Sequence, residues 1–331
     1  MDISNHPIWM STAPTTKTKI ARFKRPFHLL RFNLARYYAH LFPRSMFVGI
    51  TGSVGKTSTT IACSLVLSQK YKVLTTQPNL DPILNLPITL LKIRPSIKKV
   101  ILELGIEYPG ELDLYLSLVR PATAIVTAVG YQHSEFLGNL DSIVKEKSKL
   151  VEQLPSDGRA ILNYDDIKVR EMAKRTNAEV IFFGKDSSHC QIWADNIKIE
   201  NFKTSFEINY GVERVKIEYQ LLGEHQIYSA LAAAALGLSE GINLLIIKHA
   251  LEKVRQPEHR LEILLGFNGS LILDDSYNGS PLSIEAALDV LQKLPARRRI
   301  LVLGETKELG NYSEVAHRKI AAKIFNDRVD M

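Results

Sequence analysis

A glycine-rich segment at residues 48–60, VGITGSVGKTSTT, limits the fold of this chain more than any other feature. An apolar run precedes it and a helical pattern follows, so it joins a strand to a helix. Glycines let backbone N–H groups turn toward phosphate oxygens at the positive end of that helix, where Lys56 can reach terminal phosphates and Thr57 can ligate Mg²⁺. The spacing departs from the common rule, because Ile50 stands where the first glycine would be. The segment predicts a phosphate-binding loop (P-loop) that holds a nucleoside triphosphate.

Short apolar runs alternate with helical patterns along the chain, which is typical of a mostly parallel sheet flanked by helices. The expected strands are residues 47–50, 72–75, 100–104, 124–129, 160–163 and 180–183, and the expected helices are residues 56–69, 111–118, 140–154 and 167–176. Polar and apolar residues alternate from 191 to 222, which predicts antiparallel strands at a sheet edge. An alanine-rich helix at 225–241 and a helix at 244–254 follow.

A second and shorter α/β pattern follows a linker at residues 255–259. It predicts a hairpin at 261–265 and 270–273, a helix at 282–294, a strand at 299–303 and a helix at 313–325. This is the opening half of an α/β unit, and half a parallel sheet leaves an apolar edge uncovered. We therefore expect either a truncated reading frame or a partner that supplies the rest of the unit.

Composition excludes several classes of protein. With 331 residues, 45% hydrophobic and 23% charged, the chain is an ordinary globular protein rather than a collagenous, disordered or disulfide-scaffold one. Cys63 and Cys190 are far apart, which makes structural zinc unexpected and favours a reducing compartment. No apolar stretch is long enough to span a bilayer, and the N-terminal residues lack a signal-peptide core. The expected location is the cytoplasm.

Positive charge is concentrated in an N-terminal arm, residues 1–45. The chain carries a formal net charge of +7, and residues 1–46 hold eight Lys and Arg against Asp2 alone, so the remaining residues balance. Large apolar side chains recur in this arm at helical spacing: Phe27, Leu30, Leu34, Tyr37 or Tyr38, and Leu41. We expect an amphipathic helix whose apolar face packs on the following domain. The alternatives are attachment of residues 17–44 to an anionic membrane, at the inner face of the membrane, and contact with an anionic ligand or a partner. Because the body of the protein is neutral, no nucleic-acid binding is expected.

The T-G-S-x-G-K-T-S-T form of the P-loop resembles that of the Mur ligases, the ATP-dependent enzymes that add amino acids to the peptidoglycan precursor. Further segments are similar to the family's in the same order: TQPNLDPILNLPITLL, VILELGIEYPGEL, TAVGYQHSEFLGNLDSI, IVKEKSKL, ILNYDD, LLGEHQIYSALAAAALGL, EHRLEIL, LDDSYNGSPLSIEAAL and LVLGETKELGNYSEVAHRKI. The resemblance covers about residues 46–325. It implies an ATP-binding central domain at 46–256, built as a P-loop α/β fold with a mostly parallel sheet flanked by helices. It also implies an incomplete Rossmann-like C-terminal α/β domain at 257–331, whereas the short arm stands in place of the family's UDP-binding domain.

The resemblance also implies a reaction. The D-D-S-Y-N-x-x-P and L-G-x-x-x-E-L-G segments are similar to those of family members that add D-alanyl-D-alanine to UDP-N-acetylmuramoyl-tripeptide through an acyl phosphate, an acid–amino-acid ligation of cell-wall synthesis. Two alternatives remain open: a related ligase acting on another carboxylate, of the folylpolyglutamate or cyanophycin type, and a truncated nucleotide-binding module without ligase activity. The expected partners are therefore a UDP-linked muramoyl peptide and D-alanyl-D-alanine.

Site residues follow from the matching positions. The resemblance implies ATP binding by Gly52, Ser53, Val54, Gly55, Lys56, Thr57, Ser58, Gln226, Arg260, Asp275 and Asn278. It implies two Mg²⁺ ions, the first on Thr57 and the second on Glu103 and His133, and substrate contact by Asn79. Acyl transfer concentrates negative charge on phosphoryl oxygens, which calls for positioned cations rather than a protein nucleophile.

Lys147 is the third residue, with Lys56 and His133, for which the resemblance implies a catalytic role. The matching lysine of the family is carbamylated, which turns a cation into an anionic magnesium ligand. Two neighbours depart from the family pattern, because Glu146 replaces a small residue and Lys149 replaces an acidic one.

Overall fold

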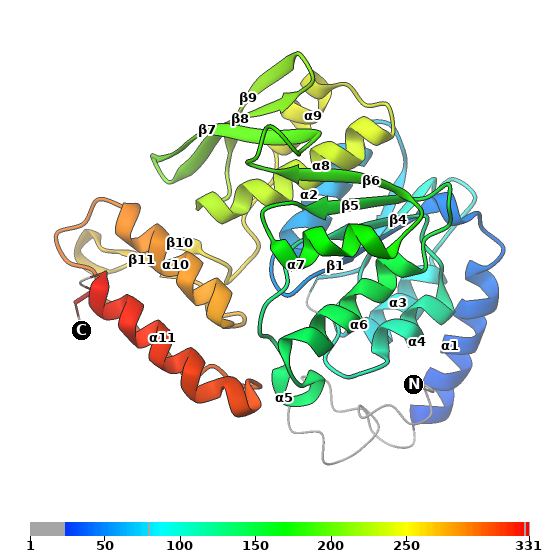
Figure 1. The fold of residues 1–331 in the computed structure, drawn as a ribbon, viewed down its shortest axis with the longest axis horizontal. Helices are drawn as coiled ribbons and strands as arrows, with labels where there is room; N and C mark the ends of the chain where they lie inside the picture. Colours follow the sequence, from blue (N-terminus) through cyan, green and yellow to red (C-terminus); the bar gives the residue numbers. More distant parts are fainter. Residues whose placement is uncertain (1–23, 79, 328, 331) are drawn as a thin grey trace.

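The computed structural model describes residues 24–78, 80–327 and 329–330 (Figure 1). A nine-stranded sheet forms its centre, in the order β2-β3-β1-β4-β5-β6-β7-β8-β9. The strands are β1 (Phe47–Thr51), β2 (Val73–Thr75), β3 (Lys99–Glu103), β4 (Thr123–Val126), β5 (Arg159–Asn163), β6 (Glu179–Gly184), β7 (Ile192–Glu200), β8 (Lys203–Tyr210) and β9 (Glu213–Tyr219). All neighbours from β2 to β7 are parallel, and β7, β8 and β9 pair antiparallel. The predicted mostly parallel α/β sheet is confirmed.

Helices cover both faces of this sheet (Figure 1). They are α1 (Arg25–Ala39), α2 (Lys56–Leu67), α3 (Pro82–Leu90), α4 (Glu111–Leu118), α5 (Ser134–Leu137), α6 (Leu140–Glu152), α7 (Ile167–Arg170), α8 (Ile227–Ser239) and α9 (Leu244–Leu251). Successive strand residues point to opposite faces, so Val100 and Leu102 of β3 join one core and Ile101 joins the other. The first core includes side chains of α1, α3, α4 and α6, and the second includes those of α2, α8 and α9.

The alanine-rich helix α8 packs closely on α2. A Cβ on Gly237 would lie 2.6 Å from Val66 Cγ1 and 2.9 Å from Ile247 Cδ1, so only glycine fits without rearrangement. The small side chains of α8 thus let the helix approach the sheet and α2, which hold the P-loop.

The main domain departs from the expected secondary structure at residues 167–176 and at residues 82–90. The helix expected at 167–176 is split into α7 and a 3-10 helix, η5 (Glu171–Arg175). Helix α3 was not predicted, although the sequence carries its start signal: the Asp81 side chain accepts from Ile83 N at 3.0 Å and Pro82 occupies the first turn.

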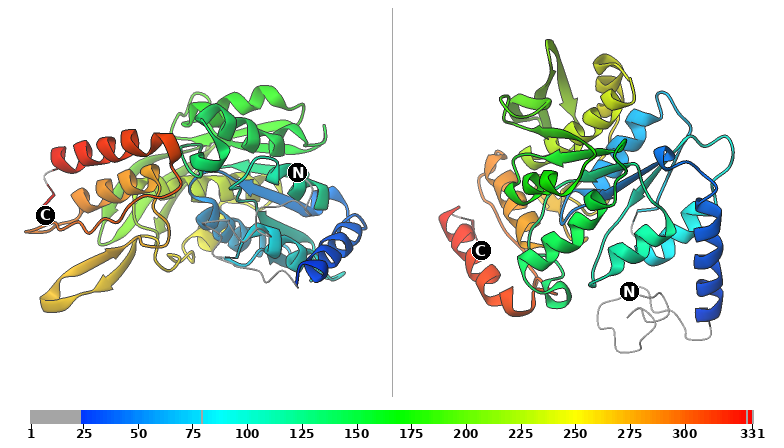
Figure 2. Two further views of the ribbon diagram at one scale, coloured as in Figure 1. Left: turned by 90° about the horizontal axis from the view of Figure 1, so that it is seen from below. Right: turned by 45° about the vertical axis from the view of Figure 1, so that its right-hand side comes forward.

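The C-terminal elements form a smaller unit beside the main sheet. It contains the hairpin β10 (Glu262–Leu265) and β11 (Leu271–Asp274), then α10 (Pro281–Lys293), η8 (Gly310–Tyr312) and α11 (Ser313–Asn326). The gold hairpin extends away from the main sheet (Figure 2, left). The strand expected at 299–303 is wrong, because the only pairing there within the described chain is an isolated bridge between Ile300 and Asp330. A strand requires a neighbour along its length, and Val302 is 94% exposed. The proposed truncation or partner stays a prediction.

Helix α1 packs on α3 and α4, but not through the stripe that the sequence suggested. Its buried residues are Phe32, Ala35 and Ala39, whereas Phe27, Leu30, Leu34, Tyr37 and Leu41 are exposed. Tyr38, which was the alternative to Tyr37, is partly buried and donates from its hydroxyl to Ile93 O at 2.7 Å. The expected packing face is therefore wrong, because the side opposite the stripe also carries apolar side chains. No described helix is long and apolar enough to cross a membrane.

Candidate active site

A cavity of about 490 Å³ lies between the carboxyl ends of the central strands and the C-terminal unit. It is lined by most of the residues singled out in the sequence: Ser53, Val54, Gly55, Lys56, Thr57, Ser58, Glu103, His133, Gln226, Arg260, Asp275 and Asn278. Gly52 and Lys147 are not among the lining residues, and Asn79 lies outside the described residues. The structure thus brings together residues that are more than 200 positions apart in the sequence.

The P-loop is held by the segment that follows β4. Ser53 N donates to Ala128 O at 2.7 Å, and Thr127 Oγ1 donates to Val54 O at 2.6 Å. Gly52 has φ +152°, and a Cβ there would lie 2.0 Å from Thr127 Oγ1. Gly55 adopts a left-handed conformation immediately before α2. Glycine is therefore required at both positions, by close approach and by conformation respectively.

Lys56 lies in the first turn of α2 and bends back over the loop. Its Nζ donates to Gly52 O at 2.9 Å and to Ser53 O at 3.3 Å. Burial lowers the pKa of Lys56 to about 8, and the positive charge of Arg260 acts in the same direction, whereas Glu103 opposes it. An anion placed among these groups would favour the charged form of Lys56.

Thr57 and Glu103 bring two oxygen atoms together at the cavity wall. Thr57 Oγ1 donates to Glu103 Oε1 at 3.0 Å, from the start of α2 to the end of β3. Hydroxyl and carboxylate oxygens are the hard ligands that Mg²⁺ prefers. This donor set therefore fits a magnesium ion that also binds phosphate oxygens.

His133 connects the main sheet to the C-terminal unit. Its Nδ1 contacts Glu308 Oε2, and the adjacent Ser134 Oγ donates to Leu309 O at 2.9 Å. Burial lowers the pKa of His133, although the hydrogen bond with Glu308 acts in the opposite direction. When Nδ1 carries the proton of the neutral ring, Nε2 keeps a lone pair for a metal ion.

Lys147 lies directly beneath the P-loop on α6. It is 1% exposed, and its Nζ donates to Gly52 O at 3.0 Å, the oxygen that also accepts from Lys56. Burial lowers the pKa of Lys147 well below its ordinary value, and the charge of Lys56 lowers it further. Lys147 therefore favours the neutral amine, the form that reacts with CO₂.

The unusual neighbours of Lys147 compensate each other. Glu146 Oε1 accepts from Gly110 N and Leu112 N at the start of α4, and Glu146 Oε2 pairs with Lys149 Nζ at 2.6 Å. Lys149 also pairs with Asp113 at 2.6 Å. Compared with the family pattern, the acidic residue therefore precedes Lys147 instead of following it. The contacts of Glu146 and Lys149 with α4 hold α6 against that helix.

Arg260 and Asp275 enter the cavity from the hairpin that begins the C-terminal unit. The Arg260 guanidinium lies over the Tyr277 ring at 4.3 Å, and Leu261 N donates to Asp275 Oδ1 at 3.1 Å. Burial raises the pKa of Asp275 to about 6.

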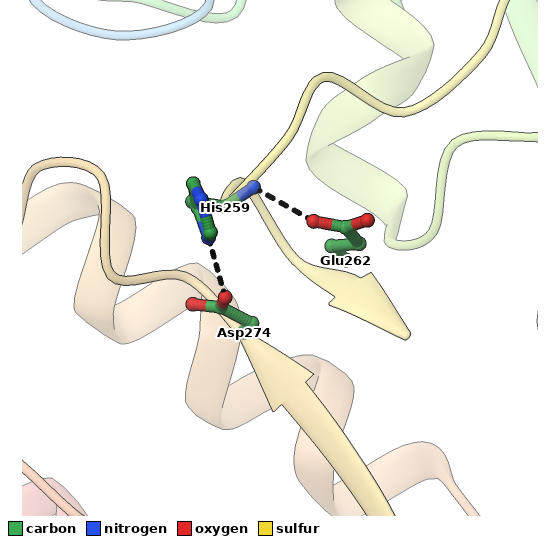
Figure 3. Close-up of side chains that lie close together, drawn as sticks. All are labelled: His259, Glu262 and Asp274. Carbon is green, nitrogen blue, oxygen red and sulfur yellow. Dashed lines mark hydrogen bonds and ion pairs between the residues drawn. The ribbon is translucent and has the colours of Figure 1, made fainter. Parts of the chain in front are cut away.

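A neighbouring cluster of His259, Glu262 and Asp274 is exposed or half-buried (Figure 3). His259 N donates to Glu262 at 3.0 Å, and His259 Nδ1 contacts Asp274 Oδ2 at 2.6 Å. These bonds brace the two ends of the hairpin next to Arg260 and Asp275.

Two family patterns match this chain. The pattern for the Mur ligase middle domain matches residues 50–237, and the pattern for the Mur ligase glutamate ligase domain matches residues 259–331. The chain belongs to the Mur ligase family. Mur ligases are ATP-dependent amide-bond ligases. Residues of both matched domains line the cavity of this Mur ligase chain.

Individual relatives are similar over most of the chain. The UDP-N-acetylmuramoyl-tripeptide–D-alanyl-D-alanine ligase of Escherichia coli is 35% identical over 286 residues, covering 85% of this chain and 63% of that protein. The ligase of the same name from Bacillus subtilis is 30% identical, covering 86% of this chain and 61% of that protein. The crystal structure of MurF from Acinetobacter baumannii matches with a TM-score of 0.85 and 26% identity, covering 92% of this chain and 66% of that one. This Mur ligase chain spans about six tenths of the length of its curated relatives.

Sequence reasoning missed two acidic side chains of this Mur ligase site. Glu308 lines the cavity and contacts His133, and Glu111 lines it while accepting from Tyr108 N at 3.0 Å. Glu308 is the acidic residue of the L-G-x-x-x-E-L-G segment and Glu111 lies in VILELGIEYPGEL, but neither was given a role in the site. A search for every acidic residue in those segments would have found them.

Proposed function

We propose that this chain catalyses the ATP-dependent ligation of D-alanyl-D-alanine to UDP-N-acetylmuramoyl-tripeptide through an acyl phosphate. The names of the similar proteins from E. coli and B. subtilis support these substrates. One observation carries the proposal: a single cavity contains the P-loop residues Lys56 and Thr57, the acidic residue Glu103 and the C-terminal Arg260. A carboxylate that awaits phosphorylation would find all of these charges around one space.

The chain's own residues supply binding, charge and orientation. Lys56 and the N–H groups at the start of α2 would bind ATP phosphates, and Arg260 would add positive charge from the C-terminal unit. Thr57 and Glu103 would hold one Mg²⁺, and Glu103 with His133 would hold a second. When bound, Mg²⁺ neutralises phosphate charge that develops during phosphoryl transfer. Arg260 and Tyr277 line the cavity, where they would limit access of the water that would otherwise hydrolyse the acyl phosphate.

Lys147 would act as a carbamate. Its neutral amine would add to CO₂ with formation of one C–N bond and release of one proton, giving an anion beside Lys56. Two observations support this role. The amine is buried, and no acidic side chain forms a hydrogen bond with Nζ among the described residues, so its positive charge is not compensated there. The carbamate would place a negative charge where the structure has an amine whose positive charge acts on His133.

The experiment measures phosphate release from ATP by the chain with each substrate alone and with both together. We expect release that requires both UDP-N-acetylmuramoyl-tripeptide and D-alanyl-D-alanine. Release with another carboxylate and amine would instead support the folylpolyglutamate or cyanophycin type of ligase. ATP binding with no substrate-stimulated release would contradict ligation and support a nucleotide-binding module.

A matched pair of lysine variants tests the carbamate. Lys147→Ala should lose turnover that added bicarbonate does not restore, whereas Lys145→Ala, at an exposed position two residues earlier on α6, should keep it. Normal turnover of Lys147→Ala would show that the carbamate has no role, while leaving the ligation itself in place.

A further inference from the structure

Helix α1 carries two apolar faces, of which the fold uses one. Phe32, Ala35 and Ala39 pack into the first core. The other face, continued by Leu41 in the turn after the helix, forms an exposed stripe made of Phe27, Leu30, Leu34, Tyr37 and Leu41. Exposure within this stripe ranges from 52% for Leu34 to 76% for Leu41. A row of large apolar side chains in water is costly, so the stripe is expected to have an occupant.

The stripe has the shape of an interfacial helix rather than of a pocket. Its residues recur at intervals of three and four, and its helical part, from Phe27 to Tyr37, extends over about 15 Å at 1.5 Å per residue. Two aromatic side chains, Phe27 and Tyr37, stand among the leucines, as in helices that lie at the headgroup level of a bilayer. Such a surface needs no groove in its partner.

Charge decides between the candidate occupants. Residues 3–80 contain no Asp or Glu, and the described part of α1 and its flanks carries Lys24, Arg25, Arg31 and Arg36. A second copy of the helix would bring Arg31 beside the same positive charges, with no acidic side chain to pair across the seam. Two heptads are also short for a coiled coil. An anionic lipid surface complements both the charge and the apolar stripe.

The position of α1 leaves the cavity accessible. The helix lies at one edge of the molecule, and α10 and α11 of the C-terminal unit lie at the opposite edge (Figure 1). The cavity is lined by residues of α10, such as Leu282 and Ser283, and by none of α1. Attachment through the stripe would therefore not cover the cavity.

We propose that the exposed stripe of α1 binds the chain peripherally to an anionic membrane surface. The apolar side chains enter the boundary between headgroups and acyl chains, while the basic residues remain among the anionic headgroups. This attachment is independent of the ligation proposed above, because it uses none of the cavity residues.

The test is co-sedimentation of the full chain with vesicles of phosphatidylglycerol and phosphatidylcholine, compared with phosphatidylcholine alone. We expect binding to the anionic vesicles that weakens with added salt. The double variant Leu34→Glu and Tyr37→Glu should lose at least about tenfold in vesicle affinity, because it removes apolar area and adds negative charge.

A control of equal charge separates the stripe from net charge. Val212→Glu with Leu265→Glu also adds two negative charges at exposed apolar positions, on the β8–β9 turn and on β10. It should retain most vesicle binding, and both double variants should keep the wild-type unfolding temperature. Equal loss in both double variants would overturn the role of the stripe. If the wild-type chain does not bind anionic vesicles but self-associates, and the stripe variant abolishes that self-association, the membrane proposal is overturned. The occupant of the stripe would then be a second copy of the chain.

Discussion

The main sheet domain and the C-terminal unit contribute to the same cavity but are stabilised very differently. The main domain has two extensive cores, one on each face of the sheet. The C-terminal unit has two small clusters, and one of them includes Leu222, which precedes α8 of the main domain. Val302 and Phe267 of the unit are almost fully exposed. The comparison teaches that a part of the site, including Arg260, Asp275 and Glu308, depends on docking of a unit with a small core.

Besides the apolar cluster that contains Leu222, hydrogen bonds and one aromatic stack dock this unit next to α5. Glu135 N donates to Glu308 O at 3.0 Å, Ser134 Oγ donates to Leu309 O, and Tyr131 stacks on Tyr312. These contacts lie beside His133. Placement of the C-terminal unit and orientation of His133 are therefore expected to change together.

The largest expected effect lies in the main domain. Lys56→Ala should lower kcat/KM for ATP by about 10²–10³-fold, because it removes the cation at the P-loop. Phosphate release measures this loss, and thermal unfolding should change little since the main cores are intact. Lys198→Ala, at an exposed position on β7, is the control. Unchanged turnover of Lys56→Ala would contradict the assignment of the site.

A pair of core truncations tests the comparison directly. Leu231→Ala in α8 and Leu288→Ala in α10 remove the same atoms from buried positions, and each should cost about 2–5 kcal/mol of the free energy of unfolding where it acts. Hydrogen exchange should accelerate across the main sheet in the first variant and only within residues 257–331 in the second. Faster exchange of β1 and β4 in Leu288→Ala would show that the two regions unfold as one.

Glu308→Gln tests the coupling between docking and His133. Loss of this carboxylate should lower kcat by about 10–100-fold with little change in KM for ATP, because the P-loop is untouched. Steady-state kinetics separates the two constants, and Glu305→Gln at an exposed position is the control. A rise in KM for ATP with unchanged kcat would place Glu308 in nucleotide binding instead.

The pH dependence should report the charge of Lys56. With its pKa lowered to about 8, Lys56 loses its proton above that pH in the free protein. The value of kcat/KM for ATP should therefore fall about tenfold per pH unit above pH 8. Lys56→Arg, which stays charged, should flatten this limb even if its overall rate is lower. An unchanged limb in that variant would assign the titration to another group.

The smallest expected effect concerns the aromatic stack. The Tyr131 and Tyr312 rings lie 3.4 Å apart at 13°, and such pairs contribute about 0.5–1.5 kcal/mol. Tyr312→Ala should weaken docking by up to about tenfold, measured as faster hydrogen exchange in α5, while Tyr312→Phe should retain it. Equal hydrogen exchange of α5 in both variants would show that the aromatic stack does not contribute to docking.

Much of the main domain could be predicted because its signals are local. The P-loop glycines, the strand before them and the helix after them are contiguous, and buried parallel strands appear as short apolar runs. The prediction of a strand at 299–303 was wrong because strand formation depends on residues that are distant in the sequence. An apolar run shows that a segment can form a strand, but pairing depends on a neighbouring strand that the described residues do not supply.

The sequence by itself determined the P-loop, the alternation of strands and helices around the parallel part of the main sheet, and the membership of one family, because each depends on contiguous patterns. Only the tertiary structure decided which face of α1 packs and which side chain meets His133. Helical spacing defines a stripe without saying which stripe is buried when both sides are apolar. Glu308 stands 175 positions from His133, so their contact depends on how two domains dock.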